Sequence, residues 1–98
     1  MAKVHEYELV VILSPELTDE SLTSGIERVQ EAISSRGGEV IDVSTWGRRR
    51  LAYPIKRHLE GTYVVTQLKM DPAQVRDLEN SLRISEDVIR HLVVRRDE

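Results

Sequence analysis

The chain of 98 residues contains no cysteine and no phenylalanine, and only three prolines. The absence of cysteine excludes disulfide bonds, thiolate zinc sites, iron–sulfur clusters and cysteine nucleophiles. No stretch approaches the ~20 apolar residues that a membrane-spanning helix needs. The start, MAKVHEYELVV, lacks the pattern of a cleavable signal peptide. We therefore expect a cytoplasmic protein that has no membrane partner.

Motifs for nucleotide binding and catalysis are also missing. Neither GxxxxGK[ST] nor GxGxxG occurs, and no serine lies in a GxSxG turn. The histidines at positions 5, 58 and 91 form no recognisable metal-ligand motif. Paired acidic residues, such as Glu6 with Glu8 and Asp19 with Glu20, are interpreted as solvated charges. Nothing in the sequence indicates a pocket that would shift their pKa values. We expect no enzymatic activity, no cofactor, no metal site and no small-molecule substrate.

The charge of the chain is distributed unevenly. Hydrophobic residues make up 40% and charged residues 32%, which is typical of one globular domain covering residues 1–98. The net charge is −3, yet residues 43–59 contain five basic residues and no acidic one, so the rest of the chain carries −8. This concentration of positive charge indicates a local anionic partner.

Hydrophobic periodicity predicts six elements in the order strand, helix, strand, strand, helix, strand. A glycine within the first helix, Gly25, predicts close packing against a neighbouring element. A second glycine, Gly47, predicts a bulge in the second strand. The expected ranges are residues 7–13, 18–36, 40–55, 62–70, 72–82 and 88–94, with a polar link at 56–61 and a turn at 85–87.

This order is that of an α+β, ferredoxin-like split β-α-β fold, in which a four-stranded antiparallel sheet carries two helices on one face. The other face is then uncovered. The first and last strands are apolar at nearly every position, whereas a solvated face should alternate with polar residues. Either the open face packs against a partner or these apolar positions are merely tolerated there, and we favour the partner, because exposed contiguous apolar surface usually marks an interface.

The run Gly47-Arg48-Arg49-Arg50 is the most informative part of the basic segment. Alternation along a strand places Arg48 and Arg50 on one face and Arg49 on the other. Arginine suits phosphate through its planar donor fork. A charged edge strand that resists edge-to-edge pairing has the same composition, so the residues alone leave both interpretations open.

A wider pattern resembles ribosomal protein six of the bacterial small subunit, over about residues 5–95. It consists of Tyr7-Glu8, Pro15, Gly37-Gly38, Gly47-x-Arg49-Arg50-Leu51-Ala52-Tyr53-Pro54-Ile55, Gly61-x-Tyr63 and Arg90-His91-Leu92-Val93-Val94. The resemblance implies a non-enzymatic structural protein, bound to the ribosome in the cytoplasm. Its implied partners are the central domain of small-subunit ribosomal RNA and ribosomal protein eighteen.

We assign candidate residues on this basis. The candidate RNA-binding residues are Arg48, Arg49, Arg50, Lys56, Arg57, Lys3, Arg90 and Arg95. The candidate residues of the protein interface are Tyr53, Ile55, Trp46 and Tyr63. Trp46 is included for its large amphipathic ring, which either anchors a contact or covers the hairpin.

Three other functions share this element order. The main alternative is a stand-alone ferredoxin-like regulatory or ligand-binding module. A domain that stacks RNA bases on its open sheet needs aromatic residues on the central strands. Only Tyr7 and Tyr63 are available there, which is few for binding a single strand. An enzyme of the acylphosphatase type would need a phosphate-cradling loop where this chain has Ser14-Pro15-Glu16.

Overall fold

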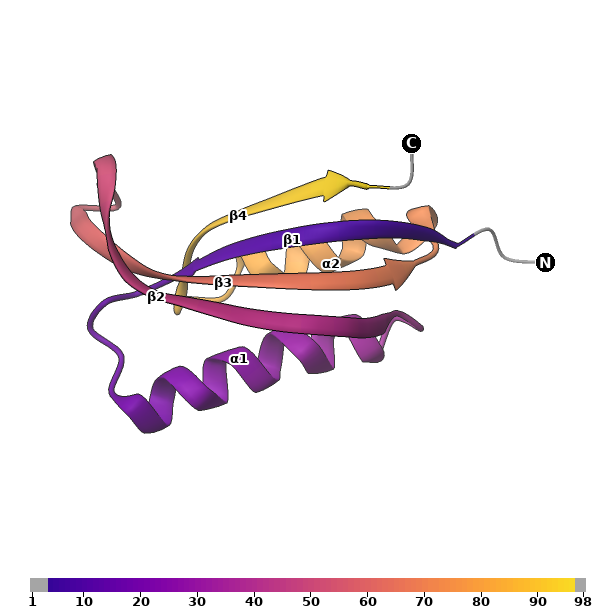
Figure 1. Cartoon of the computed structure of the whole chain (residues 1–98), viewed down its shortest axis with the longest axis horizontal. Coiled ribbons are helices and arrows are strands. Elements are labelled where there is room, and N and C mark those ends of the chain that lie inside the picture. The colour runs from indigo at the N-terminus through magenta and orange to yellow at the C-terminus, as the bar shows by residue number, and fades with distance from the viewer. Residues whose placement is uncertain (1–3, 97–98) are drawn as a thin grey trace.

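The computed structural model describes residues 4–96, which form the predicted order of strands and helices (Figure 1). The elements are β1 (His5–Leu13), α1 (Asp19–Ser34), β2 (Glu39–Ile55), β3 (His58–Met70), α2 (Val75–Arg83) and β4 (Val88–Arg95). A short 3-10 turn, Pro72–Gln74, leads into α2. No helix in the described range is long and apolar enough to cross a membrane.

The sheet is antiparallel throughout, with strand order β2-β3-β1-β4. The first and third strands therefore lie in the centre, and β2 and β4 form the edges. Both helices lie on one face of the sheet (Figure 1). The ferredoxin-like fold is confirmed, and Pro54 lies in an edge strand, where its missing N–H costs least.

The main core lies between the helices and the sheet. Alternate residues of β1 point toward the helices, because successive side chains of a strand project to opposite faces. The buried side chains of this core include Leu9, Val11 and Leu13 from β1, Val29 and Ile33 from α1, Val64 and Leu68 from β3, and Leu78 and Leu82 from α2. Burying each such side chain contributes roughly 1.5–3 kcal/mol. The packing between the sheet and the helices therefore holds both helices in place.

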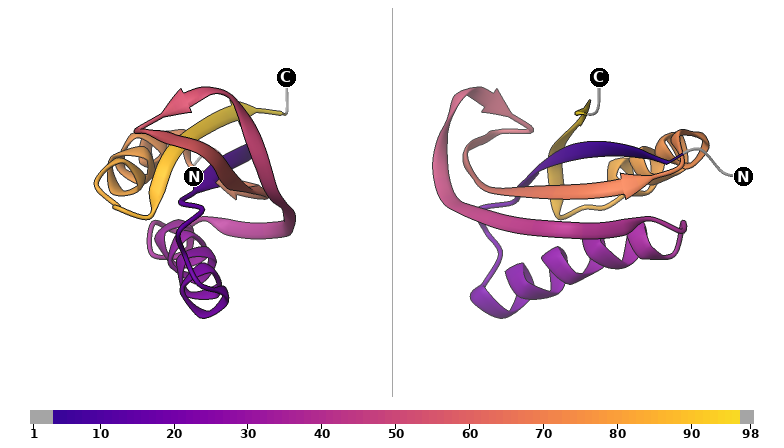
Figure 2. Two further views of the ribbon diagram at one scale, coloured as in Figure 1. Left: turned by 90° about the vertical axis from the view of Figure 1, so that its left-hand side faces the viewer. Right: turned by 45° about the vertical axis from the view of Figure 1, so that its right-hand side comes forward.

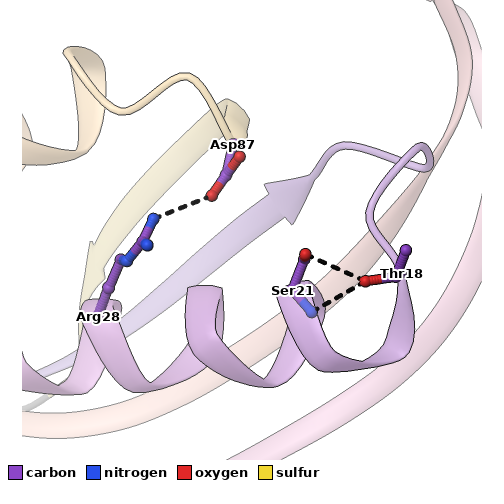
Figure 3. A network of polar contacts seen from close by, with 4 residues as sticks. All are labelled: Thr18, Ser21, Arg28 and Asp87. Atoms are coloured by element: carbon purple, nitrogen blue, oxygen red, sulfur yellow. Dashed lines mark hydrogen bonds and ion pairs between the residues drawn. The ribbon is translucent and has the colours of Figure 1, made fainter.

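Polar contacts fix the start of α1 and its position along the sheet (Figure 3). The Thr18 hydroxyl accepts a hydrogen bond from the backbone N–H of Ser21 at 3.2 Å, as the predicted helix start requires. Arg28 on α1 forms an ion pair with Asp87, just before β4, at 3.3 Å. Because the arginine is exposed, this pair orients the helix more than it stabilises the fold.

The predicted polar link at residues 56–61 is wrong. The turn has only two residues, Lys56 and Arg57, and β3 begins directly after them at His58. Both turn residues have positive φ, 48° and 71°, which is the backbone of the tight hairpin turns that match strand twist. Such turns usually contain Asn-Gly. The sequence Lys56-Arg57 therefore did not indicate a two-residue turn.

The two glycine predictions have different outcomes. At Gly47 the backbone has φ 84° and the pairing of β2 with β3 shifts by one residue, which confirms the bulge. At Gly25 the expected close packing is not found. A Cβ there would have the Leu13 Cδ1 as its nearest neighbour at 3.8 Å, which is an ordinary van der Waals distance.

Beyond the bulge, the β2–β3 hairpin curls away from α1 and over the open face of the sheet (Figure 2). The curled end creates a second, small core in which Ile12, Leu51 and Ile89 are buried, with Ile55 and Tyr63 packed against them. The hairpin approaches β1 very closely at Gly61, where a Cβ would lie 2.3 Å from Ile12 Cγ2. Only glycine allows this approach.

Candidate nucleic-acid interface

The curled end of the hairpin, residues 48–58, carries five exposed basic side chains and is called the basic hairpin end below. They are Arg48, Arg49, Arg50, Lys56 and Arg57. The basic hairpin end projects on the side of the molecule away from α1 (Figure 2). That helix carries four acidic residues and a single arginine. The molecule therefore presents positive charge at this end and negative charge along α1.

The three consecutive arginines make different contacts. Arg48 donates a hydrogen bond from Nη2 to the backbone carbonyl of Pro15 at 2.6 Å. Arg49 lies on the other face, with its guanidinium carbon 5.4 Å from the centroid of the Trp46 ring. Arg50 lines a shallow cleft that also includes Pro15. Arg48 and Arg50 thus lie on one face of the strand and Arg49 on the other, as the alternation of side chains predicted.

The tip of the hairpin combines both signs of charge. Arg50, Arg57 and His58 line the cleft near Pro15, together with Glu16 and Glu60. No hydrogen bond or ion pair of the Arg50 or Arg57 side chain occurs within residues 4–96. Their donors therefore face solvent and can reach an anion without first breaking an internal contact.

The remaining candidate RNA residues are dispersed. Arg90 on β4 lies beside the basic hairpin end, where it donates to the Tyr53 hydroxyl and lies 6.0 Å from that ring's centroid. Arg95 pairs opposite Tyr7, at the other end of β1 from the hairpin, with its Nη2 2.9 Å from His5 Nδ1. Lys3 lies outside the described residues. All of these assignments remain predictions.

The open face contains an apolar groove of about 200 Å³ beneath the curled hairpin, named here the open-face groove. Of the four residues assigned to a protein interface, Tyr53, Ile55 and Tyr63 line the groove, whereas Trp46 does not. The other lining residues are Val10, Ile12, Leu51, Ala52, Arg90, His91 and Leu92.

Five of these other lining residues, Leu51, Ala52, Arg90, His91 and Leu92, belong to the pattern that carried the resemblance, but sequence reasoning assigned none of them to a protein interface. The one available signal was that β1 and β4 are apolar on both faces. Leu92, for example, is 53% exposed.

Trp46 stands on the bulge, outside the groove. Its ring is nearly parallel to that of Tyr63, with an interplanar angle of 7° and centroids 6.5 Å apart. Tyr7, the other central-strand aromatic considered for base stacking, is buried against the helices and points away from the open face. The aromatic surface of the open face therefore includes a Trp46–Tyr63 pair that the strand pattern did not predict.

Two features of the described residues bear on metal ions and on small molecules at the open face. Among the residues that the structure describes, no three histidine or acidic side chains are grouped so as to hold a metal. The open-face groove is smaller than the 300–1,000 Å³ of usual ligand pockets. The surfaces exposed in this region include the cations of the basic hairpin end and apolar side chains that line the open-face groove.

Comparison with known proteins agrees with this description. The family model described as Ribosomal protein S6 matches residues 6–95. The small ribosomal subunit protein bS6 of Heliobacterium modesticaldum is 42% identical over 97% of this chain and 99% of its own length. The bS6 protein of Carboxydothermus hydrogenoformans is 45% identical with the same coverage. The crystal structure of 30S ribosomal protein S6 from Thermotoga maritima superposes with a TM-score of 0.90 at 34% identity, covering 96% of this chain and 89% of that one.

Proposed function

The chain belongs to the ribosomal protein S6 family, and we propose that it binds the central domain of small-subunit ribosomal RNA together with ribosomal protein eighteen. Membership of the family makes it a non-enzymatic protein of the small ribosomal subunit, bound to the ribosome in the bacterial cytoplasm. The basic hairpin end carries the proposal for RNA, and the open-face groove carries the proposal for the protein partner.

The contact with RNA is electrostatic. Arginine and lysine side chains that neutralise phosphates release counterions, and this release supplies much of the affinity for nucleic acid. The exposed cations of the basic hairpin end are grouped at one extremity, while the acidic helix α1 lies on the other side. This separation favours one limited RNA footprint and disfavours non-specific contact elsewhere.

The contact with ribosomal protein eighteen is apolar. Leu92 and Tyr53 are 53% and 56% exposed, and both line the open-face groove. Covering such side chains contributes about 25 cal/mol per Å² of apolar surface removed from water. Because the groove adjoins the basic hairpin end, a protein seated in it would also stand next to the RNA.

Arg90 joins the two surfaces. Its hydrogen bond and ring contact with Tyr53 connect β4 to the curled hairpin. We therefore place Arg90 at the boundary between the protein and RNA contacts, and we retain Lys3 and Arg95 as weaker candidates for phosphate contacts.

A matched pair of variants tests this assignment. Leu92→Asp places a carboxylate in the open-face groove and is expected to weaken binding of ribosomal protein eighteen at least tenfold. Ile84→Asp is the control, because Ile84 is 82% exposed but follows α2, away from the groove. Isothermal titration of each variant with ribosomal protein eighteen measures the difference. Equal affinities for the two variants would contradict the groove as the interface.

Capture from a lysate tests the ribosomal setting. The tagged chain is expected to recover small-subunit RNA and proteins, and nuclease treatment should release those held through RNA. Recovery of the protein partner after nuclease treatment would support a direct contact. Recovery of a small metabolite without RNA would favour the alternative of a stand-alone ligand-binding module.

A further inference from the structure

One exposed feature of the open face that neither proposed contact uses is the indole of Trp46. It is 52% exposed and lies outside the open-face groove. Its ring is held parallel to Tyr63, and the guanidinium of Arg49 lies 5.4 Å from its centroid. A large ring that is both exposed and fixed in orientation presents a preformed stacking surface.

We propose that Trp46, supported by Tyr63 and Arg49, is a stacking site for one unpaired nucleobase of RNA. This inference rests on the proposed function, since it assigns a base contact beside the phosphate contacts. Single-stranded RNA is commonly recognised by stacking of unpaired bases on aromatic rings and arginine planes. One stacked base contributes about 1–3 kcal/mol and tolerates any base, because every base has a π-face.

The bulge at Gly47 explains why the ring is available. Gly47 pairs with Tyr63, and the extra residue, Trp46, has no cross-strand partner in the register. The bulge thereby places an additional side chain next to Tyr63. The parallel contact with Tyr63 restricts the indole before RNA binds, so less conformational entropy is lost on binding.

One charge beside the Trp46 ring suits a phosphate of the same nucleotide. Arg49 lies on the face of that ring, whereas Arg48 and Arg50 lie on the other face of the strand. The Arg49 guanidinium takes part in no hydrogen bond or ion pair with other described residues. It can therefore move to an adjoining phosphate while a base occupies the indole.

The site fits one base, and not a longer run. Tyr7 is buried on the helix face and Tyr53 lies within the open-face groove. The Trp46 ring thus adds one base contact to the proposed electrostatic contact with RNA. It differs in this from a sheet that binds a single strand along its whole width.

Because Trp46 is the single tryptophan of the chain, its fluorescence reports on this site alone. The probe is a single-stranded oligoadenylate hexamer, compared with an abasic ribose-phosphate hexamer of the same charge, both at low salt. The wild-type chain is expected to bind oligoadenylate about 5- to 150-fold more tightly than the abasic hexamer, the fold-change that corresponds to one stacked base. Oligoadenylate alone is expected to quench the fluorescence.

Two variants complete the test. Trp46→Leu is expected to bind both hexamers equally when binding is followed with end-labelled RNA, whereas Trp46→Phe retains a flat ring and most of the preference. Ile41→Ala is the control, because it removes an exposed apolar side chain of the same strand that lies outside the basic hairpin end and the open-face groove, and it should leave both quenching and preference unchanged.

The outcomes separate the two proposals. Equal affinity of the wild-type chain for the two hexamers, without quenching, would overturn the base site and leave the phosphate contacts in place. Failure of both hexamers to bind the isolated chain at low salt would overturn the base site, whereas the proposed RNA contact is tested separately, with ribosomal protein eighteen present. A preference for oligoadenylate that survives in Trp46→Leu would place the base elsewhere.

Discussion

Removing charge from the tip of the hairpin should flatten the salt dependence of RNA binding. Arg50, Lys56 and Arg57 are exposed and make no hydrogen bond or ion pair within the range that the structure describes. If each neutralises one phosphate, each contributes about 0.7–0.9 to the slope of log affinity against log salt. Changing all three to glutamine should therefore reduce the slope by about two to three. At about 0.1 M salt this corresponds to a loss of roughly 100- to 500-fold in affinity.

The control removes the same kinds of charge elsewhere. Lys69, Arg76 and Arg83 are also exposed, and they lie on β3 and α2, away from the basic hairpin end. Both triple variants change the net charge equally, so a general electrostatic effect would be the same in each. Filter binding of a central-domain RNA fragment, with ribosomal protein eighteen present, gives the slope between about 0.05 and 0.3 M salt. Equal slopes in the two triple variants would refute the assignment of phosphate contacts to the hairpin tip.

Single substitutions at four positions test the local structure, with stability measured by urea denaturation. Gly61→Ala should destabilise the fold by about 1–3 kcal/mol, because its Cβ would lie 2.3 Å from Ile12 Cγ2; a neutral result would contradict the close approach of the hairpin to β1. Gly25→Ala should instead stabilise by about 0.5–1 kcal/mol, since the methyl group has room and the helix loses a flexible residue; a loss of stability would indicate packing that the distances do not show. Thr18→Ala should cost about 1 kcal/mol through loss of the cap of α1, whereas Thr18→Ser should retain it. Arg57→Gly should relieve about 1–2 kcal/mol of left-handed strain while RNA affinity falls; a parallel fall in stability would rule out strain at this turn.

Most of the architecture could be predicted because local signals and tertiary packing agree. The apolar period of α1 and the Asp71-Pro72 start of the second helical segment are sufficient to place both helices, and the structure shows the Asp71 side chain accepting from the backbone of Ala73. The bulge at Gly47 was predictable for the same reason, since glycine within a strand usually marks one.

The curl of the hairpin could not be predicted from local patterns. The turn that closes the hairpin needs positive φ at Lys56 and Arg57, which few such residues adopt. The curled end packs through contacts between Leu51, Ile12 and Ile89, which come from three different strands. Neither a turn without glycine or asparagine nor a small core of distant residues leaves a periodic signal in the sequence.

The same limit applies to the candidate site. The basic segment was evident as a composition, and its five cations do share the hairpin end. The separation of Trp46 from the open-face groove depends on how the hairpin bends. The residue types therefore indicated an anionic partner and a protein partner. The bend of the β2–β3 hairpin decides which side chains each partner can reach.

Reconstitution of three components tests the central claim most directly. The chain, ribosomal protein eighteen and a labelled fragment of the central domain of small-subunit ribosomal RNA are mixed, and RNA binding is followed by gel retardation. We predict one complex that contains all three, with much weaker retardation when either protein is omitted. Unchanged retardation of the RNA by ribosomal protein eighteen in the presence or absence of this chain would contradict the account.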